Sequence, residues 1–459
     1  MRLVSLKVYG LAIIVVVQER PGMKRVSAFC AAVVSGVRLH EECSIIRNIE
    51  KILILRNRMD MKLIERVDYL ERLIRVIGAP DIKVITGIRR CGKSKLLDAV
   101  AHYARENIED ANVIRVNFNL LEFEGLRDYH ALHEYVESRY EPNASNLVFV
   151  DEVQMCDGFE RAINSLHASE KYDLFVTGSN AFLLSSDLAT LFTGRTFEVE
   201  VFPFSLREYA TYYGIADSGE AFDRYARDGG MPGSYVYDDE STRYAYIADV
   251  FDTLVLRDVK QKYRIRNTLQ LERLSDYLMD NISNITSIRN IAAALGRSGL
   301  KITDKTAGAY VNHLSAAFAF YKVRRYDIVG KRYLSSGGKY YLADHSFRYA
   351  KLGTKNLDYG RVYENIVAIE LIRRGWEVYV GTLYQKEIDF VVVRQNEKTY
   401  IQVSDDISGE GTFKRECEPL LRIGDAYPKM IIARTRHDVY TYEGIKVIDI
   451  AQWLMENQV

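Results

Sequence analysis

The chain has 459 residues and carries 62 Lys and Arg residues against 62 Asp and Glu residues. At roughly 150 residues for each domain, this length corresponds to about three domains. Its 48% hydrophobic and 27% charged residues are typical of globular proteins and exclude a disordered, collagen-like or low-complexity chain. Because the formal net charge is zero, any contact with nucleic acid requires a local basic patch rather than the charge of the whole molecule.

The five cysteines are widely separated and include no CxxC pair. This pattern indicates neither a disulfide framework nor a zinc site, and it is typical of reduced thiols. We therefore expect a cytoplasmic protein. The cysteines are Cys30, Cys43, Cys91, Cys156 and Cys417.

The first 58 residues superficially resemble a secretory leader, because Met1-Arg2 precedes an apolar run and a stretch of small residues. Lys7 interrupts that run, which is also shorter than the ~20 residues a membrane-spanning helix needs. We expect 1–58 to be a non-native or disordered extension, with the true start at Met59 or Met61. A real leader or anchor is the alternative, and no membrane contact is expected for the rest of the chain.

A helix is predicted from Met61, where KLIERVDYLERLIRVIG spaces apolar residues at helical intervals and ends at Gly78-Ala79-Pro80. The short β-branched run 82–86 then indicates a buried strand, and helical spacing resumes at Lys95. The sequence GIRRCGKS, at 87–94, therefore lies between a strand and a helix. That context is the one in which the G-x-x-x-x-G-K-[ST] pattern indicates a phosphate-binding loop.

The residue types of this loop suit ATP and Mg²⁺. Gly87 and Gly92 allow the backbone to turn tightly and present N–H groups to phosphate oxygens at a helix N-terminus. Lys93 supplies a charge for the β- and γ-phosphates, and the Ser94 hydroxyl is a Mg²⁺ ligand. We assign nucleotide binding to Gly87, Ile88, Arg89, Arg90, Cys91, Gly92, Lys93, Ser94 and Lys95.

A second strand ends in two acids in NLVFVDEVQ, at 146–154. Four apolar residues followed by carboxylates are typical of a buried parallel strand that delivers acids to the carboxyl edge of a sheet. We expect Asp151 to hold Mg²⁺ through water and Glu152 to orient or deprotonate the attacking water. The alternative is a strand that simply enters a polar turn.

The next strand, DLFVTGSNA, ends in small polar residues that would lie near the γ-phosphate. Asn180 or Ser179 is the candidate sensor, although such residues are also ordinary turn formers. Farther on, LATLFTGR places Arg195 after a glycine. Its guanidinium either reaches a phosphate in its own or a neighbouring subunit, and stabilises the transition state, or pairs with a surface carboxylate.

The segments GIRRCGKS, VFVDEVQ, VTGSNAFLLSSDLATLFTGR and VFPFSLREY occur in this order. From about Met61 to Val459 the chain resembles prokaryotic AAA-type ATP-binding proteins whose ATPase core precedes a C-terminal domain of uncharacterised role. The resemblance implies an AAA+ ATPase core over 59–215, with Arg195 as a phosphate-contacting residue. It also implies a homo-oligomer, since an arginine finger acts across a subunit interface.

Residues 216–350 are expected to be helical and then to form a winged-helix-like region. The cluster GGMPG, at 229–233, predicts a turn between helices. Between 285 and 344 the pattern indicates two helices and a strand pair closed near Gly337-Gly338. Over 297–339 nine residues are basic and two, Asp304 and Asp327, are acidic. The basic residues are Arg297, Lys301, Lys305, Lys322, Arg324, Arg325, Lys331, Arg332 and Lys339.

This basic patch has two interpretations. It contacts the phosphates of double-stranded DNA, or it is the solvated face of an ATPase lid or protein-docking module. The second helix has an apolar side and leaves Asn312 and His313 as the main candidates for reading bases. The apolar side consists of Ala307, Val311, Leu314, Ala317 and Phe318.

Residues 351–459 resemble the restriction-endonuclease-like PD-(D/E)xK fold, with Glu364 on a helix and Asp389 on a strand. In that family two carboxylates bind a divalent metal and a lysine activates water. Here Gln402 stands at the second acid and Ser404 at the lysine, so cleavage is doubtful unless Asp405 substitutes. We expect a degenerate module that binds a protein partner.

The sequence thus predicts an α/β protein with a P-loop AAA+ core and parallel sheet, a winged-helix region and a PD-(D/E)xK-like domain. The predicted function is Mg²⁺-dependent ATP hydrolysis coupled to an unknown partner. The alternatives are a nucleotide-switched DNA-binding regulator and an ATP-dependent nuclease.

Overall fold

The computed structural model describes residues 2–8, 11–20, 23–29, 64–178, 192, 194–354 and 358–456. The chain divides into two compact units, 1–63 and 64–459. In the first unit, apolar and β-branched runs pair as an antiparallel sheet of β1 (Arg2–Val8), β2 (Leu11–Arg20) and β3 (Met23–Phe29). That 1–58 is a non-native or disordered extension stays a prediction.

The second unit begins with a five-stranded parallel sheet in the order β5-β6-β7-β4-β8. The central strands β6, β7 and β4 are short and almost entirely buried, as expected for a parallel sheet covered on both faces, whereas the edge strands β5 and β8 are only partly buried. This confirms the predicted α/β core with a parallel sheet. The strands are β4 (Ile82–Thr86), β5 (Ala111–Asn117), β6 (Ser145–Asp151), β7 (Asp173–Thr177) and β8 (Thr196–Glu200).

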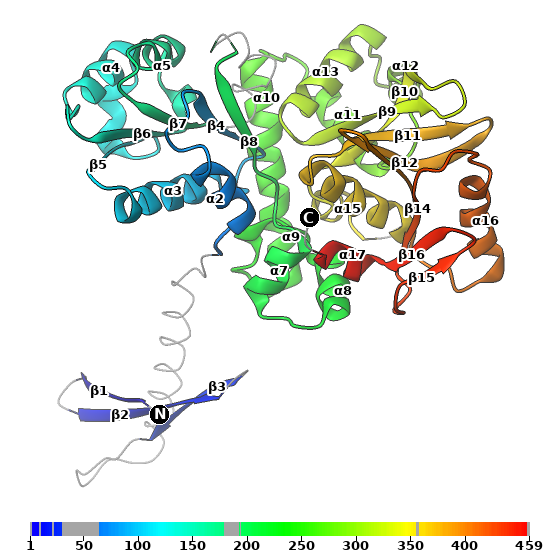
Figure 1. The fold of residues 1–459 in the computed structure, drawn as a ribbon, viewed down its shortest axis with the longest axis horizontal. Coiled ribbons are helices and arrows are strands. Elements are labelled where there is room, and N and C mark those ends of the chain that lie inside the picture. Colours follow the sequence, from blue (N-terminus) through cyan, green and yellow to red (C-terminus); the bar gives the residue numbers. More distant parts are fainter. Residues whose placement is uncertain are drawn as a thin grey trace. The chain divides into compact units, whose positions relative to one another are not determined.

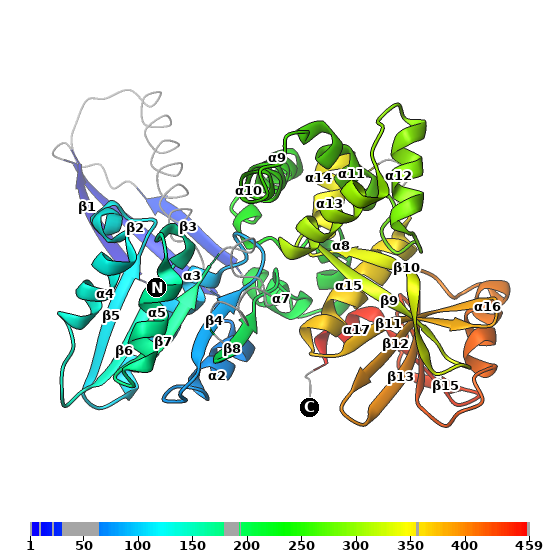
Figure 2. The same ribbon diagram turned by 90° about the horizontal axis from the view of Figure 1, so that it is seen from above.

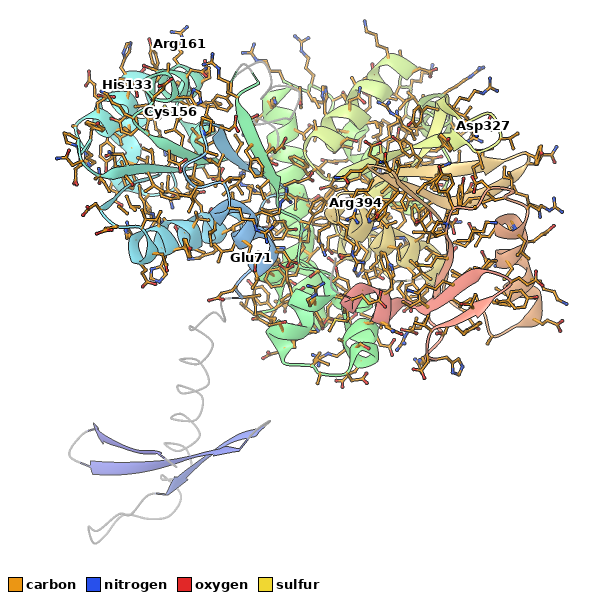
Figure 3. All side chains as sticks on the ribbon, viewed as in Figure 1. Glu71, His133, Cys156, Arg161, Asp327 and Arg394 are labelled. Carbon is orange, nitrogen blue, oxygen red and sulfur yellow. The ribbon has the colours of Figure 1, made fainter. Side chains whose placement is uncertain are left out.

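Helices cover both faces of this sheet (Figure 1). Leu147 and Phe149 of β6 belong to the core that includes α2 (Val67–Ile74) and α3 (Lys93–Asn107). The alternate residues Val148 and Val150 face a second core. That core is closed by α4 (Tyr129–Glu137) and α5 (Phe159–Ala168), and it contains Cys156, labelled in Figure 3.

A helical segment follows β8. Within it α9, a π-helical turn at Phe251–Leu256 and α10 continue one another without a break (Figure 1). The helices are α7 (Leu206–Tyr213), α8 (Ser218–Asp228), α9 (Glu240–Val250), α10 (Arg257–Lys262), α11 (Thr268–Asp280), α12 (Ile288–Arg297), α13 (Asp304–Ala316) and α14 (Ser346–Leu352). Of the helices in the described part of the chain, none has both the length and the hydropathy needed to cross a bilayer.

An eight-stranded mixed sheet, ordered β10-β9-β11-β12-β13-β14-β16-β15, forms the rest of the unit (Figure 2). It is flanked by α15 (Tyr359–Arg373), α16 (Glu410–Leu421) and α17 (Ile450–Met455). The strands are β9 (Phe320–Asp327), β10 (Arg332–Leu342), β11 (Glu377–Leu383), β12 (Lys386–Arg394), β13 (Glu397–Ser404), β14 (Lys429–Ala433), β15 (Tyr440–Tyr442) and β16 (Ile445–Asp449).

The expected boundary at 350/351 therefore cuts through one sheet. β9 pairs with β11 in parallel, with Tyr379 opposite Arg324, so the hairpin of the predicted winged-helix region is built into the C-terminal domain. The backbone N–H and C=O groups along this side of β9 are satisfied by β11 rather than by solvent, which a free wing would not provide.

The hairpin also closes at a different place from the one predicted. Asp327, labelled in Figure 3, pairs with Arg332, so the turn is at 328–331. Gly337 and Gly338 lie inside β10, at a register shift between Leu334 and Gly338. A glycine pair inside a strand marks a bulge as readily as a turn, which explains the error.

The glycines at 229–230 do more than turn the chain between helices. The Gly230 N–H donates to Asp344 Oδ2 at 2.6 Å. A Cβ atom on Gly230 would lie under 3.0 Å from both the Phe204 carbonyl oxygen and Asp344 Oδ2. The cluster is therefore a close contact between the segment after β8 and the end of the β9–β10 hairpin.

Candidate nucleotide site

The phosphate loop joins β4 to α3 through three residues with left-handed backbone conformation, namely Gly87 (φ 127°), Arg90 (φ 62°) and Gly92 (φ 106°). A side chain at Gly87 is excluded twice, because its Cβ atom would also fall under 3.0 Å from the Val201 carbonyl oxygen. Helix α3 begins at Lys93. Its free N–H groups and its dipole therefore face the loop, an arrangement that favours anions.

Lys93 is buried inside this loop, with 4% of its surface exposed. Its ammonium donates to the carbonyl oxygens of Gly87 at 2.8 Å and Ile88 at 3.1 Å. Among the described residues no carboxylate lies within ion-pair distance of Lys93. A buried cation without a counter-charge is costly, so the loop is ready for an anionic ligand.

Asp151, at the end of β6, lies beside the first turn of α3. The Ser94 hydroxyl donates to Asp151 Oδ1 at 3.0 Å, and the Thr177 hydroxyl donates to the same oxygen. Oδ2 is buried and has no hydrogen-bond partner in the described part of the chain. Burial raises the pKa of Asp151, against the smaller opposing effects of its hydrogen bonds from Thr177 and Ser94 and of the Lys93 charge. The free oxygen and the Ser94 hydroxyl are hard oxygen donors, which fit Mg²⁺.

Glu152 follows directly and is also buried. Its backbone is left-handed (φ 56°), an uncommon conformation for a non-glycine residue that often marks a functional site. Its N–H donates to Thr177 Oγ1 at 3.0 Å, and its carboxylate accepts from the Gln154 side-chain amide. Both acids of β6 are thus fixed at the carboxyl edge of the sheet, beside the phosphate loop.

Thr177 is the site residue that sequence reasoning passed over. It is the last residue of β7, and its hydroxyl contacts both Asp151 and the Glu152 backbone. The available signal was its position as the last strand residue before a glycine. The candidates Ser179 and Asn180 lie outside the described residues.

Arg195 lies at the opposite edge of the sheet from the phosphate loop. Its carbonyl accepts from Ile82 N at the start of β4, and Thr196, which begins β8, stands opposite Ile82. The loop follows the other end of β4, so five strand residues, at ~3.3 Å each, separate the two levels. The Arg195 side chain is exposed. Within one chain it is therefore not placed to contact a nucleotide in this loop.

The other loop side chains face away from the anion cradle. Ile88 and Cys91 are buried in the core, so only their backbone faces the loop. Arg89 pairs with Asp258 of α10 at 2.7 Å, and the Arg90 guanidinium lies 5.2 Å from the Tyr246 ring centroid of α9. Lys95 is exposed on α3. The two arginines thus connect the loop to the continuous helix α9–α10.

Two carboxylates on β8 form a second connection that the sequence did not reveal. Glu198 accepts from the Thr86 hydroxyl at 2.9 Å, and Glu200 accepts from the Tyr321 hydroxyl of β9. Burial, with a smaller effect of Glu198, raises the pKa of Glu200 to about 7. Glu200 pairs in register with Thr86, the residue before Gly87, so this bond reaches the base of the phosphate loop.

The predicted basic patch is divided by the structure. Lys339 is buried, Arg325 donates to Thr382 Oγ1 at 3.1 Å, and Arg332 pairs with Asp327. His313, one of the two expected base readers, stacks on Tyr263 with ring centroids 3.5 Å apart. The buried side of α13 includes Ala307, Val311 and Leu314, as predicted.

Comparison with known proteins identifies the domain. Residues 79–210 match an AAA domain, and residues 219–358 match a domain of unknown function (DUF8612). An uncharacterized Haemophilus influenzae protein is 34% identical over 87% of this chain and 100% of its own length. An uncharacterized Methanocaldococcus jannaschii protein is 26% identical over 75% of this chain and 79% of its own.

Among solved structures, a Walker-type ATPase of Pyrococcus abyssi is 17% identical, with 63% of this chain and 95% of that chain covered. The TM-score of this match is 0.46. The identity and full coverage of the Haemophilus influenzae relative show that this chain belongs to the same family as that relative, and the match over 79–210 shows that it contains an AAA domain.

Proposed function

We propose that the protein binds ATP with Mg²⁺ at the phosphate loop and hydrolyses it. One juxtaposition supports this proposal. A buried ammonium that forms no ion pair among the described residues, and a buried carboxylate oxygen that has no hydrogen-bond partner among them, flank the N-terminus of α3. Triphosphate and a divalent cation are complementary to these two groups.

The chain's own residues divide the work. Lys93 exchanges its two carbonyl acceptors for phosphate oxygens, while the N–H groups of the loop hold the remaining oxygens. Ser94 and Asp151 hold the metal, which supplies charge neutralisation at the β- and γ-phosphates when bound. Glu152 accepts a hydrogen bond from the attacking water, orients it toward the γ-phosphate and accepts its proton. Thr177 keeps both acids in place.

Replacing Lys93 with alanine should remove nucleotide binding, because the buried positive charge of the loop is lost. Equilibrium binding of a fluorescent ATP analogue checks this, with Lys95→Ala as the matched control, since Lys95 is a neighbouring but exposed lysine of the same helix. Unchanged affinity in Lys93→Ala would show that the nucleotide binds elsewhere.

The variant Glu152→Gln should bind ATP with near-normal affinity and hydrolyse it at least roughly 10²-fold more slowly, because an amide cannot act as the base. Phosphate release and retention of bound ATP are the two measurements. If turnover stays at the wild-type rate, the water-activating role belongs to another residue.

Arg195 acts, in our proposal, on the nucleotide of a neighbouring copy. Its place at the amino edge of the sheet, exposed and away from its own loop, suits a residue presented across a homo-oligomer interface. A guanidinium that completes a neighbour's site stabilises charge in the transition state for hydrolysis.

Mixing two inactive variants tests this arrangement. Arg195→Ala alone should lose roughly 10³-fold in hydrolysis rate, and addition of Lys93→Ala, which retains Arg195, should restore part of the activity. Arg161→Ala is the control, since Arg161 is a surface arginine of α5 (Figure 3). A mixture that stays inactive would contradict action between subunits.

A second candidate function is binding of nucleic acid, and the β9–β10 hairpin favours it. Lys322, Arg324 and Lys331 are exposed, and no carboxylate within the described ranges forms an ion pair with any of them. Beside them Tyr333 is 62% exposed, with its ring centroid 5.0 Å from that of Tyr379. An exposed aromatic ring beside cations without an ion pair is suited to stacking on a base while the cations contact phosphates, and it favours single strands over duplexes.

For this candidate, Arg324→Ala and Tyr333→Ala should each weaken binding of a labelled single-stranded oligonucleotide about tenfold. Fluorescence anisotropy at several salt concentrations measures the effect, and Arg324→Ala should also reduce the salt dependence. Tyr384→Ala serves as control, because Tyr384 is 76% exposed but lies in the turn after β11. Equal losses in all three variants, or tighter binding of duplex, would contradict the candidate.

A further inference from the structure

The C-terminal domain contains a buried lysine enclosed by carboxylates. Lys339 of β10 is 2% exposed. Its ammonium lies 2.7 Å from Glu364 Oε1 on α15, 2.6 Å from Glu387 Oε1 and 3.4 Å from Asp389 Oδ1, the last two on β12. Glu364 and Asp389 are the residues expected to bind a divalent metal in a restriction-endonuclease-like site.

The cluster holds its cation tightly. Burial alone would lower the pKa of Lys339, but Glu364, Asp389 and Glu387 together raise it well above its usual range, so the side chain is an ammonium ion. The Tyr341 hydroxyl donates to Glu364 Oε1 at 2.6 Å, the same oxygen that accepts from Lys339. Three acidic side chains thus meet at one positive charge. Burial raises the pKa of Glu364 to about 8, against the opposing effect of Lys339.

Hydrogen bonds also fix the polar groups around this cluster. Gln402 accepts from the Asp389 backbone N–H at 2.7 Å and donates to Glu416 at 2.9 Å. Asp389 Oδ2 accepts from the Val403 N–H at 2.9 Å. Ser404 donates to the carbonyl of Asp406, and Asp405 is exposed. Among the described residues, no group of three or more His, Cys, Asp or Glu side chains is arranged to bind a metal ion.

We propose that the Lys339 ammonium is the resident cation of this cluster and takes the place that a divalent metal would need. A metal ion and an ammonium cannot share the same carboxylate oxygens, because each would be repelled by the other at close range. The site is therefore a metal-free ion-pair cluster that joins β10, α15 and β12. It is not a metal-dependent centre for phosphodiester cleavage.

Lys339 lies on a strand outside the expected nuclease motif. Its position supports the view that a lysine has replaced the metal ion as the cation of this cluster. Among the basic residues of 297–339 it is the one that the fold buries completely. The lysine expected near Ser404 is thus absent in sequence while a positive charge is supplied in space by another strand. The inference concerns the C-terminal domain and does not depend on ATP hydrolysis.

The test is titration of the full chain with Mn²⁺ in the absence of nucleotide, followed by electron paramagnetic resonance. Wild type and Asp389→Asn should bind Mn²⁺ equally, because Asp389 does not bind the metal in the wild type. Lys339→Met, which keeps length but loses charge, should gain an Mn²⁺ site at least roughly tenfold tighter than any in the wild type. That gain should disappear in Lys339→Met/Asp389→Asn, and Lys339→Arg should not gain it.

Two results would overturn the proposal. One is Mn²⁺ binding to wild type that depends on Asp389. The other is a folded Lys339→Met variant, judged by circular dichroism, that binds Mn²⁺ no better than wild type. If Lys339→Met does not fold, the comparison of wild type with Asp389→Asn still decides, because it requires no substitution of Lys339.

Discussion

Parallel pairing of β6, β7 and β4 is the constraint on which the nucleotide site depends. Val150 stands opposite Val176, and Ile85 opposite Thr177, so the ends of the three strands lie at one level. Each strand then delivers one element of chemistry there: the two acids, the hydroxyl that positions them, and the phosphate loop. None of these groups is adjacent in sequence, and no local preference brings them together. Hydrophobic burial on both faces of the sheet keeps this register. A shift by one residue would turn the side chains that pack in one core toward the core on the other face.

The same edge is physically connected to the rest of the second unit. Arg89 reaches Asp258 on α10, and Glu200 accepts from Tyr321 on β9. A conformational change of the loop on nucleotide binding would therefore act directly on two contacts, one with α10 and one with β9 of the mixed sheet. The π-helical turn between α9 and α10 lies just before Asp258, and wider turns of this kind are often found at functional positions.

The sequence was most informative where the functional residues are close together along the chain. The loop from Gly87 to Ser94, the acids after β6 and the parallel core could be predicted because their signals are short and local. Thr177 was missed because a threonine at a strand end is ordinary until its neighbours are known. The Arg195 prediction left open which subunit it serves, since only the pairing of β8 with β4 shows the edge on which it lies. Lys339 was placed on a surface patch because charge counting along the chain carries no information about burial, and the hairpin was closed at the wrong glycines because bulges and turns share composition.

The irregularity in β10 decides which side of the sheet its residues occupy. Leu334 stands opposite Arg325 and Gly338 opposite Arg324, so β10 advances four residues while β9 advances one. Side chains normally alternate between faces, yet Leu334 and Lys339, an odd number of residues apart, face the same way. A chain that lost one residue of this bulge would send Lys339 to the opposite face, and the three carboxylates would be left without a cation. Deletion of one residue from the bulge would thus remove the positive charge from the buried cluster, although no charged residue would have been replaced.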